Sequence, residues 1–220
     1  GPTGLRGSAN ASSWLSAPAG TMGFVIGLPE LEVAAELARL TRDPHEVAIG
    51  NVNAAQQVVL TGRREPVLRA LDHLAMHALK SEALPLGWPM HSPALAPVAA
   101  ELAELVSSRI RFAFPGRAAL YAPMLGRVVR NEEEARLVLT SQIARTSRWA
   151  DVLLAMASAG ETRFVEVGPG DLLSKMHRWT LRSSRADVLE DPAGIARFAS
   201  ALGAPALGAP ARPAAGEEVA

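Results

Sequence analysis

The order of predicted elements between residues 20 and 86 constrains the fold of this chain more than any other feature. Apolar runs with β-branched residues predict four strands, and amphipathic patterns predict two helices among them. In sequence, we expect a strand at 21–28, a helix from Pro29 to about residue 41, strands at 46–53 and 57–61, a helix at 64–77 and a strand at 79–86. This order is the split βαβ pattern. It predicts that residues 20–86 form a small α/β subdomain.

The two helices of this region differ in how clearly the sequence marks them. Pro29 suits a first helical turn, and acidic residues follow it, as the helix dipole favours. The apolar face expected for this first helix is Leu31, Ala34, Ala35 and Ala38. The second helix has a stronger pattern, with apolar residues at helical spacing at 67, 68, 71, 74 and 75. Four residues, 53–56, are expected to connect the two middle strands as a hairpin.

A second run of α/β elements follows residue 86. The predicted elements are a helix at 93–110, short strands near 119–122 and 126–129, a helix at 132–144 capped by Asn131, a helix at 148–158 capped by Ser147, a strand at 163–167 and a helix from Asp171 to about residue 181. Residues 87–190 are therefore expected to be the C-terminal part of a larger α/β subdomain. Residues 1–19 are expected to be a linker or disordered arm, and residues 191–220 a largely disordered tail in which residues 195–202 could form a short helix.

The composition excludes several classes of protein. The 220 residues carry 22 basic and 22 acidic side chains, so nothing in the charge indicates a nucleic acid or an anionic membrane as partner. There is no cysteine, which removes disulfides, thiolate catalysis and cysteine-based zinc sites. No apolar run approaches the ~20 residues that span a bilayer.

The candidate catalytic residue is His91, in the segment 84–95 between the two runs of elements. Pro89 and Pro93 restrict the backbone on both sides of it. A histidine held in a rigid turn before a helix is well placed for proton transfer, since its ordinary pKa lies near neutral pH. Taken alone, a surface or packing role is the commoner one for a histidine. The rest of the chain favours the catalytic role.

Two other features have simpler interpretations. Gly168-Pro169-Gly170 follows a predicted strand and precedes a helix, which suits anion binding but is more typical of a βα turn. His73 and His77 lie four apart on one helix, as metal ligands do, but no third ligand is evident. We favour a solvated helix face and predict no metal site. The chain also contains no P-loop, no dinucleotide-binding glycine pattern and no G-x-S-x-G nucleophile elbow.

Five segments in order resemble one family. They are 20–28 (GTMGFVIGL), 51–62 (NVNAAQQVVLTG), 86–95 (LGWPMHSPAL), Gln142 six residues before Arg148-Trp149, and 164–173 (FVEVGPGDLL). Together they are similar to the malonyl-CoA:acyl-carrier-protein transacylases of fatty acid synthesis and the acyltransferase domains of polyketide synthases. The resemblance covers residues 20–182. It implies an acyltransferase-type, α/β-hydrolase-like large subdomain, present here in part, with a ferredoxin-like small subdomain.

The resemblance also implies a mechanism. In this family an elbow serine attacks the thioester of malonyl-CoA, and a histidine, here His91, takes the serine proton and later activates the phosphopantetheine thiol of the carrier protein. A backbone carbonyl orients the histidine, and by position it belongs to Gln142. Asn51 and Asn53 are expected to line the acyl-CoA entrance, with turn chemistry in a hairpin as an equal alternative. No permanently bound cofactor is implied; the CoA thioester and the carrier's phosphopantetheine are substrates.

The chain departs from the family in its first part. The oxyanion loop, the serine elbow and the arginine that pairs with the malonyl carboxylate have no counterpart in the sequence. We therefore expect the serine to lie outside this chain, on an N-terminal segment or a separate chain, and the isolated chain to be prone to aggregation. Trp88-Pro89-Met90-His91 is closer to the free-standing transacylases than to polyketide patterns. Acyl selectivity stays open.

Three functions remain open at this point. The first is part of an acyltransferase whose partners are an acyl-CoA and an acyl carrier protein. The second is the transacylase subunit of a malonate decarboxylase, and the third is a non-catalytic scaffold or interaction module with the same fold. The expected location is the cytoplasm.

Overall fold

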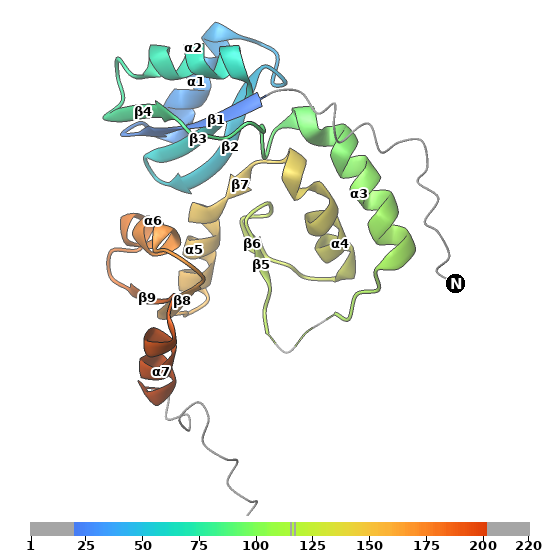
Figure 1. The fold of residues 1–220 in the computed structure, drawn as a ribbon, viewed down its shortest axis with the longest axis vertical. Helices are drawn as coiled ribbons and strands as arrows, with labels where there is room; N and C mark the ends of the chain where they lie inside the picture. The colour runs from blue at the N-terminus through green and yellow to red at the C-terminus, as the bar shows by residue number, and fades with distance from the viewer. Residues whose placement is uncertain (1–19, 115, 117, 202–220) are drawn as a thin grey trace, which may run out of the picture.

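The computed structural model describes residues 20–114, 116 and 118–201 (Figure 1). The expected arm at 1–19 and the end of the expected tail, 202–220, lie outside the described residues. The described elements form three groups: a sheet with two helices, a helical group with a short hairpin, and a small βαβ group. The candidate site lies where the first and third groups face each other.

The first group is a mixed sheet of five strands in the order β4-β1-β3-β2-β7. The strands are β1 (Gly20–Ile26), β2 (Val47–Ala54), β3 (Gln57–Arg63), β4 (Lys80–Ala83) and the two-residue β7 (Ser147–Arg148). β1, β2, β3 and β4 pair antiparallel, and β7 joins β2 in parallel. The hairpin between β2 and β3 turns over two residues, Ala55 and Gln56, and is therefore tighter than the four-residue connection expected.

Helices α1 (Glu30–Leu40) and α2 (Arg64–Leu74) cover one face of this sheet (Figure 1). The main core lies between them and the strands, with Val25, Val58 and Leu60 fully buried. The apolar face expected for α1 is wrong: Leu31 is 83% exposed, and Val33 and Leu37 face the core instead. Alanines occupy several positions of α1, so its apolar spacing fits two faces almost equally, and the larger side chains Val33 and Leu37 bury more surface.

The second group begins after residue 92. A 3₁₀ turn, η1 (Pro93–Leu95), leads into α3 (Ala96–Arg109), and the short hairpin β5 (Tyr121–Ala122) and β6 (Arg127–Val128) leads into α4 (Glu132–Ser141) and the 3₁₀ turn η2 (Gln142–Ala144). The Asn131 side chain accepts a hydrogen bond from the Glu134 amide at 2.8 Å, which is the predicted cap. Ala122, Val129 and Ala135 form a small core of this group.

The third group is a βαβ unit with flanking helices. Its elements are α5 (Trp149–Ser158), β8 (Arg163–Val167), α6 (Leu172–Thr180), β9 (Arg185–Leu189) and α7 (Pro192–Ala201). β8 and β9 pair in parallel as a two-stranded sheet. The predicted cap at Ser147 is wrong, because Ser147 pairs with Asn51 in the sheet and Arg148 occupies the cap position. Helix α7 also gives structure to the first part of the segment expected to be a disordered tail.

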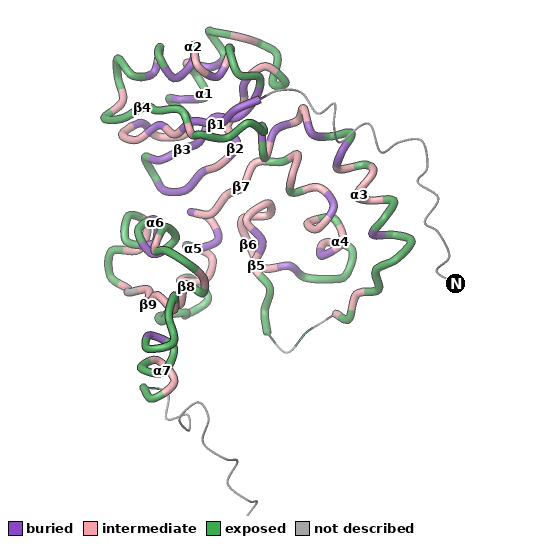
Figure 2. The backbone as a smooth tube through the Cα atoms, viewed as in Figure 1, coloured by how far each residue is buried: buried purple, intermediate pink, exposed green. Residues whose placement is uncertain are grey.

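Burial is uneven across the three groups. Figure 2 shows buried backbone concentrated in the sheet and on the inner side of α2, whereas α6 and α7 are largely exposed. None of the helices in the described part of the chain has the length and apolar composition needed to cross a membrane.

Candidate functional site

His91 lies in a turn that is hydrogen-bonded to strand β3 of the sheet. The Thr61 hydroxyl donates to the Met90 carbonyl at 2.7 Å, and the neighbouring Pro89 is fully buried. Ser92 is also buried and accepts a hydrogen bond from the Ala94 amide at 3.2 Å, which starts the following 3₁₀ turn. These anchors on both sides hold His91 at a φ of +60°, a left-handed conformation that a residue other than glycine seldom adopts. Such backbone strain is typical of functional positions.

Two backbone carbonyls fix the orientation of the His91 ring. Nδ1 lies 2.8 Å from the Gln142 carbonyl and 3.2 Å from the Arg145 carbonyl. A carbonyl oxygen can only accept, so Nδ1 carries the proton and donates it. In the neutral ring Nε2 then has a free lone pair and can take a proton from a substrate or nucleophile. The sequence indicated the Gln142 carbonyl by resemblance alone, and it gave no signal for Arg145.

The carbonyl pair is supplied by the 3₁₀ turn η2 and its continuation. The Thr146 hydroxyl, next to Arg145, donates to the Ile49 carbonyl of β2 at 2.9 Å. The following strand β7 then pairs with β2. The segment that orients His91 is therefore fastened to the same strand that carries Asn51 and Asn53.

His91, Asn51 and Asn53 line one cleft of about 520 Å³. Asn51 and Asn53 lie in β2, ahead of the two-residue turn of the hairpin. The pairing of β2 with β3 is irregular between Val52 and Ala54, and Asn53 lines the cleft together with Asn51. Neither carboxamide side chain makes a hydrogen bond to another described residue, and both remain free to contact a ligand. Trp149 and Met176 contribute to the opposite wall of the cleft.

An ion-pair network joins the sheet to the third group beside the cleft. The Arg148 guanidinium donates to both carboxylate oxygens of Glu30 at 2.8 Å and to Asp151 at 2.5 Å. The hydrogen bond from Arg148 lowers the pKa of Glu30, and the hydrogen bonds to Glu30 and Asp151 raise the pKa of Arg148. Because α1 carries Glu30 and α5 carries Asp151, this network fixes where Trp149 stands at the cleft wall.

The Gly168-Pro169-Gly170 loop is a βα turn between parallel strands, as favoured from the sequence. The start of α6 is occupied by the Glu166 carboxylate, which accepts from the Leu173 and Ser174 amides at 3.0 and 2.8 Å. Partial burial raises the pKa of Glu166, but these hydrogen bonds outweigh it and the net pKa is lowered. The helix end thus already holds an anion of the chain itself.

His73 pairs with an acid rather than with a second ligand. Its Nε2 lies 2.8 Å from the Glu36 carboxylate, and the hydrogen bond lowers the pKa of Glu36. Among residues 20–114, 116 and 118–201, no group of three histidine, aspartate or glutamate side chains is arranged to hold a metal ion.

A cleft that holds a histidine with a free Nε2 beside two uncommitted carboxamides is the kind of site that group-transfer enzymes use. No family model matches the chain. A polyketide synthase of Streptomyces halstedii, GfsA, is 32% identical over 170 residues, which are 77% of this chain and 2% of that protein. The malonyl CoA-acyl carrier protein transacylase of Escherichia coli is 28% identical over 182 residues, 80% of this chain and 57% of that protein.

Solved structures agree with these relatives. The crystal structure of the malonyl-CoA:acyl carrier protein transacylase of Xanthomonas oryzae is 28% identical, has a TM-score of 0.78, and is matched over 86% of this chain and 60% of that one. The chain is thus a homologue of the malonyl-CoA:acyl-carrier-protein transacylases and polyketide synthase acyltransferases, as the five segments predicted. It spans a little over half the length of the transacylases it matches.

Proposed function

We propose that this chain is the histidine-bearing part of an acyltransferase that moves a malonyl or related acyl group from CoA to an acyl carrier protein. The observation that carries the proposal is the ring of His91, held by the Gln142 carbonyl at 2.8 Å with Nε2 free. The relatives named malonyl CoA-acyl carrier protein transacylase support the substrate and the acceptor. Scaffold or malonate decarboxylase roles have no comparable observation in their favour.

The chemistry follows from one proton acceptor used twice. A serine hydroxyl gives its proton to His91 Nε2 as its oxygen attacks the thioester carbonyl. The C–S bond breaks, and the protonated His91 returns the proton to the departing CoA thiolate. In the second half, His91 takes the proton of the carrier's phosphopantetheine thiol, whose sulfur attacks the acyl ester. The serine oxygen leaves and recovers the proton from His91.

Asn51 and Asn53 are proposed to hold the acyl-CoA at the entrance of the cleft. Their carboxamides each offer two donors and an acceptor, which suits the amide and carbonyl groups of a thioester-bearing arm. Strands β1 to β4 with α1 and α2, over residues 20–86, are proposed to be the ferredoxin-like small subdomain. Residues 87–190 are proposed to belong to the large subdomain, with His91 at the junction.

The attacking serine is proposed to come from outside residues 1–220. The sequence contains no G-x-S-x-G elbow. Apolar side chains of α6 at the cleft wall, Leu172 and Leu173, are 62% and 40% exposed, which suits a surface that packs against a further segment. The segment that carries the serine, together with this chain, would form the complete site.

The test is acyl transfer by this chain assembled with the serine-bearing segment. Replacing His91 by alanine removes the general base, and transfer of malonyl from CoA to carrier protein should fall by about 10²–10⁴-fold. His45→Ala is the matched control, because His45 is exposed in the connection between α1 and β2 and does not line the cleft. Equal transfer by the His91→Ala variant and the wild type would contradict the proposal and leave the scaffold role.

A further inference from the structure

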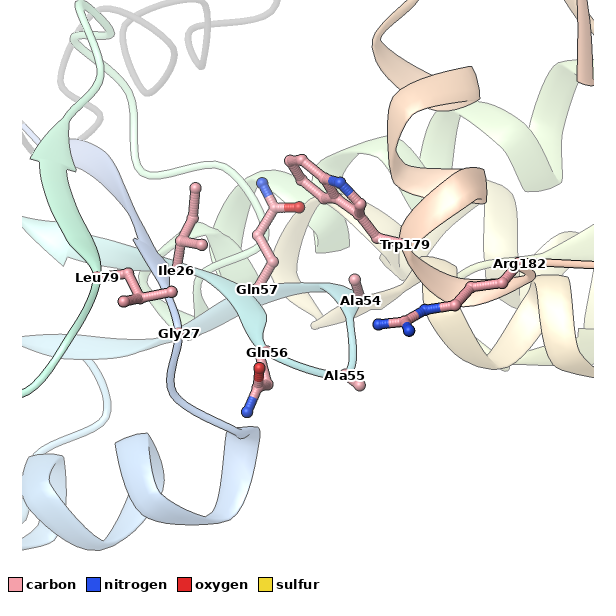
Figure 3. Close-up of a pocket in the computed structure, with 9 residues that line it drawn as sticks. All are labelled: Ile26, Gly27, Ala54, Ala55, Gln56, Gln57, Leu79, Trp179 and Arg182. Atoms are coloured by element: carbon pink, nitrogen blue, oxygen red, sulfur yellow. The ribbon is translucent and has the colours of Figure 1, made fainter.

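A second hollow lies at the tip of the β2–β3 hairpin, against the C-terminal end of α6 (Figure 3). Its volume is about 260 Å³. Trp179 and Arg182 line one side, and Ala54, Ala55 and Gln57 line the other. None of the interactions that position His91 uses Trp179 or Arg182, so the hollow is a feature separate from the proton-transfer site.

Arg182 brings an uncommitted positive charge to this hollow. Its guanidinium forms no ion pair or hydrogen bond with any of the described residues, and Figure 3 shows it extending toward the hairpin. Helix α6 ends at Thr180, where free carbonyls repel anions. Any anion held here is therefore held by the guanidinium, whose planar donors match a phosphate in two parallel hydrogen bonds.

Trp179 adds an aromatic surface beside that charge. Its side chain is 52% exposed, and it lines the same hollow as Arg182, which follows the end of α6. A large indole left half in solvent loses much of the burial energy it would gain in a core. An exposed ring next to a free guanidinium suits a ligand that carries both a phosphate and a flat or apolar group.

Gln57 connects this hollow with the His91 cleft, because it lines both. The residue is only 8% exposed, and its Oε1 is buried without a hydrogen-bond donor. In Figure 3 its carboxamide points toward the Trp179 ring. A buried acceptor left without a donor costs about 1–3 kcal/mol. A ligand N–H group that passes between the two hollows would satisfy it.

Strand β2 gives the span between the two hollows. Gly50 marks the His91 end of this span, because a Cβ added to Gly50 would lie 3.3 Å from the Met90 carbonyl oxygen. Ala54 marks the other end, because it lines the second hollow. Four residues of regular strand cover roughly 13 Å at about 3.3 Å per residue, and the irregular pairing of β2 on both sides of Asn51 and Val52 makes this an upper limit. A ligand that occupies both hollows is therefore long and narrow, with amide groups along its length and an anion at its far end.

We propose that Trp179 and Arg182 bind the phosphate end of a phosphopantetheine arm whose sulfur lies at His91. This rests on the acyl transfer proposed above. The arm's amide N–H group meets Gln57 Oε1, and its phosphate meets Arg182. In CoA the phosphate continues into an adenine nucleotide, and Trp179 packs against the base. In the carrier-bound arm the same phosphate is esterified to the protein.

The test measures binding to the purified chain by calorimetry, with CoA, phosphopantetheine and pantetheine as probes. CoA and phosphopantetheine should bind about tenfold or more tightly than pantetheine, and Arg182→Gln should remove this difference. Trp179→Leu should weaken the binding of CoA more than the binding of phosphopantetheine. Arg178→Gln is the matched control, because Arg178 is exposed on the same helix and lines neither hollow, and it should bind all three probes as the wild type does.

Three results would overturn the inference: no binding of CoA, equal affinity for all three probes, or unchanged affinities in the Arg182→Gln variant. The outcome is separable from that of the proposed function. If CoA binding depends on Arg182 while His91→Ala leaves acyl transfer intact, only the proposed mechanism fails. If acyl transfer depends on His91 but pantetheine binds as tightly as phosphopantetheine, only the proposed phosphate site is contradicted.

Discussion

His91 shows how much of this site is decided at a single backbone position. A left-handed conformation at a residue with a side chain costs about 1–3 kcal/mol and persists only where the surroundings enforce it. Here the buried Pro89, the hydrogen bond from Thr61 to the Met90 carbonyl and the Ser92 cap enforce it together. The prolines were visible in the sequence, whereas the role of Thr61, thirty positions upstream, required the folded sheet.

Glu134 is expected to make the stability of the fold depend on pH. Its carboxylate accepts hydrogen bonds from the Arg127 guanidinium and the Arg130 amide, each at 2.9 Å, and these lower its pKa to about 2. Because the folded-state pKa is depressed, the pair stabilises the fold above the ordinary carboxylate pKa, and this contribution is lost as the pH falls toward about 2. Urea denaturation of Glu134→Gln and wild type should differ at neutral pH and converge in acid.

Glu133→Gln supplies the comparison for this measurement, since Glu133 is exposed in the same helical turn and takes no part in the ion pair. Its free energy of unfolding should follow the wild type at every pH. A Glu134→Gln variant whose deficit widens on acidification would contradict the assignment.

Among the elements, the contact between α1 and α5 through Arg148 sets the geometry of the cleft. The sequence predicted both helices, and the resemblance marked Arg148-Trp149, but neither indicated that Glu30 is the partner, because 118 positions separate the two residues. The bidentate geometry and partial burial distinguish this pair from ordinary surface ion pairs, which contribute little.

Arg148→Gln should lower the free energy of unfolding by about 1–3 kcal/mol, since it removes charged hydrogen bonds to two carboxylates. Urea denaturation measures the loss, and a double-mutant cycle with Glu30→Gln isolates the coupling between the pair. Arg69→Gln is the matched control, because Arg69 is exposed and its ion pair with Glu65 is long, at 3.9 Å. If both arginine variants lose the same stability, the junction has no special role.

The elements that the sequence predicted well are those whose periodicity comes from a single buried face. Helix α2 is of this kind, and the structure confirms it. Strands β1 and β8 are also confirmed, but their signal was a short run of apolar and β-branched residues, and β1 is buried at consecutive positions. Strand β9 was not predicted, because Arg185 and Asp187 interrupt its short apolar pattern and its pairing with β8 is set by tertiary contacts. The wrong cap at Ser147 has the same origin: a local capping signal was overridden by pairing with a distant strand.

At the scale of the whole molecule, the third group is unusually open. Parallel sheets in α/β proteins are normally buried on both faces and have several strands, whereas β8 and β9 form a pair. Val167 at the end of β8 is 80% exposed, and Leu172 at the start of α6 is 62% exposed. The arrangement fits the proposal that a further segment packs here.

The isolated chain is expected to self-associate through this surface. Sedimentation velocity over increasing protein concentration should show growing oligomers, and Leu172→Gln should reduce them because it removes exposed apolar area from the cleft wall. Leu31→Gln is the matched control: Leu31 is 83% exposed but lies on α1 and does not line the cleft. A monomer at every concentration, or equal effects of the two variants, would contradict this expectation.

The orientation of His91 by main-chain carbonyls has a consequence for how the site tolerates substitution. Where a carboxylate holds a catalytic histidine, one codon change can delete the orienting group. Here every amino acid at positions 142 and 145 supplies the same carbonyl oxygen. Genetic drift at these two positions can alter the side chains freely as long as the 3₁₀ turn persists. The positions where substitution would disturb the site are those that hold the backbone of this turn in place. One is Thr146, whose hydroxyl donates a hydrogen bond to the Ile49 carbonyl.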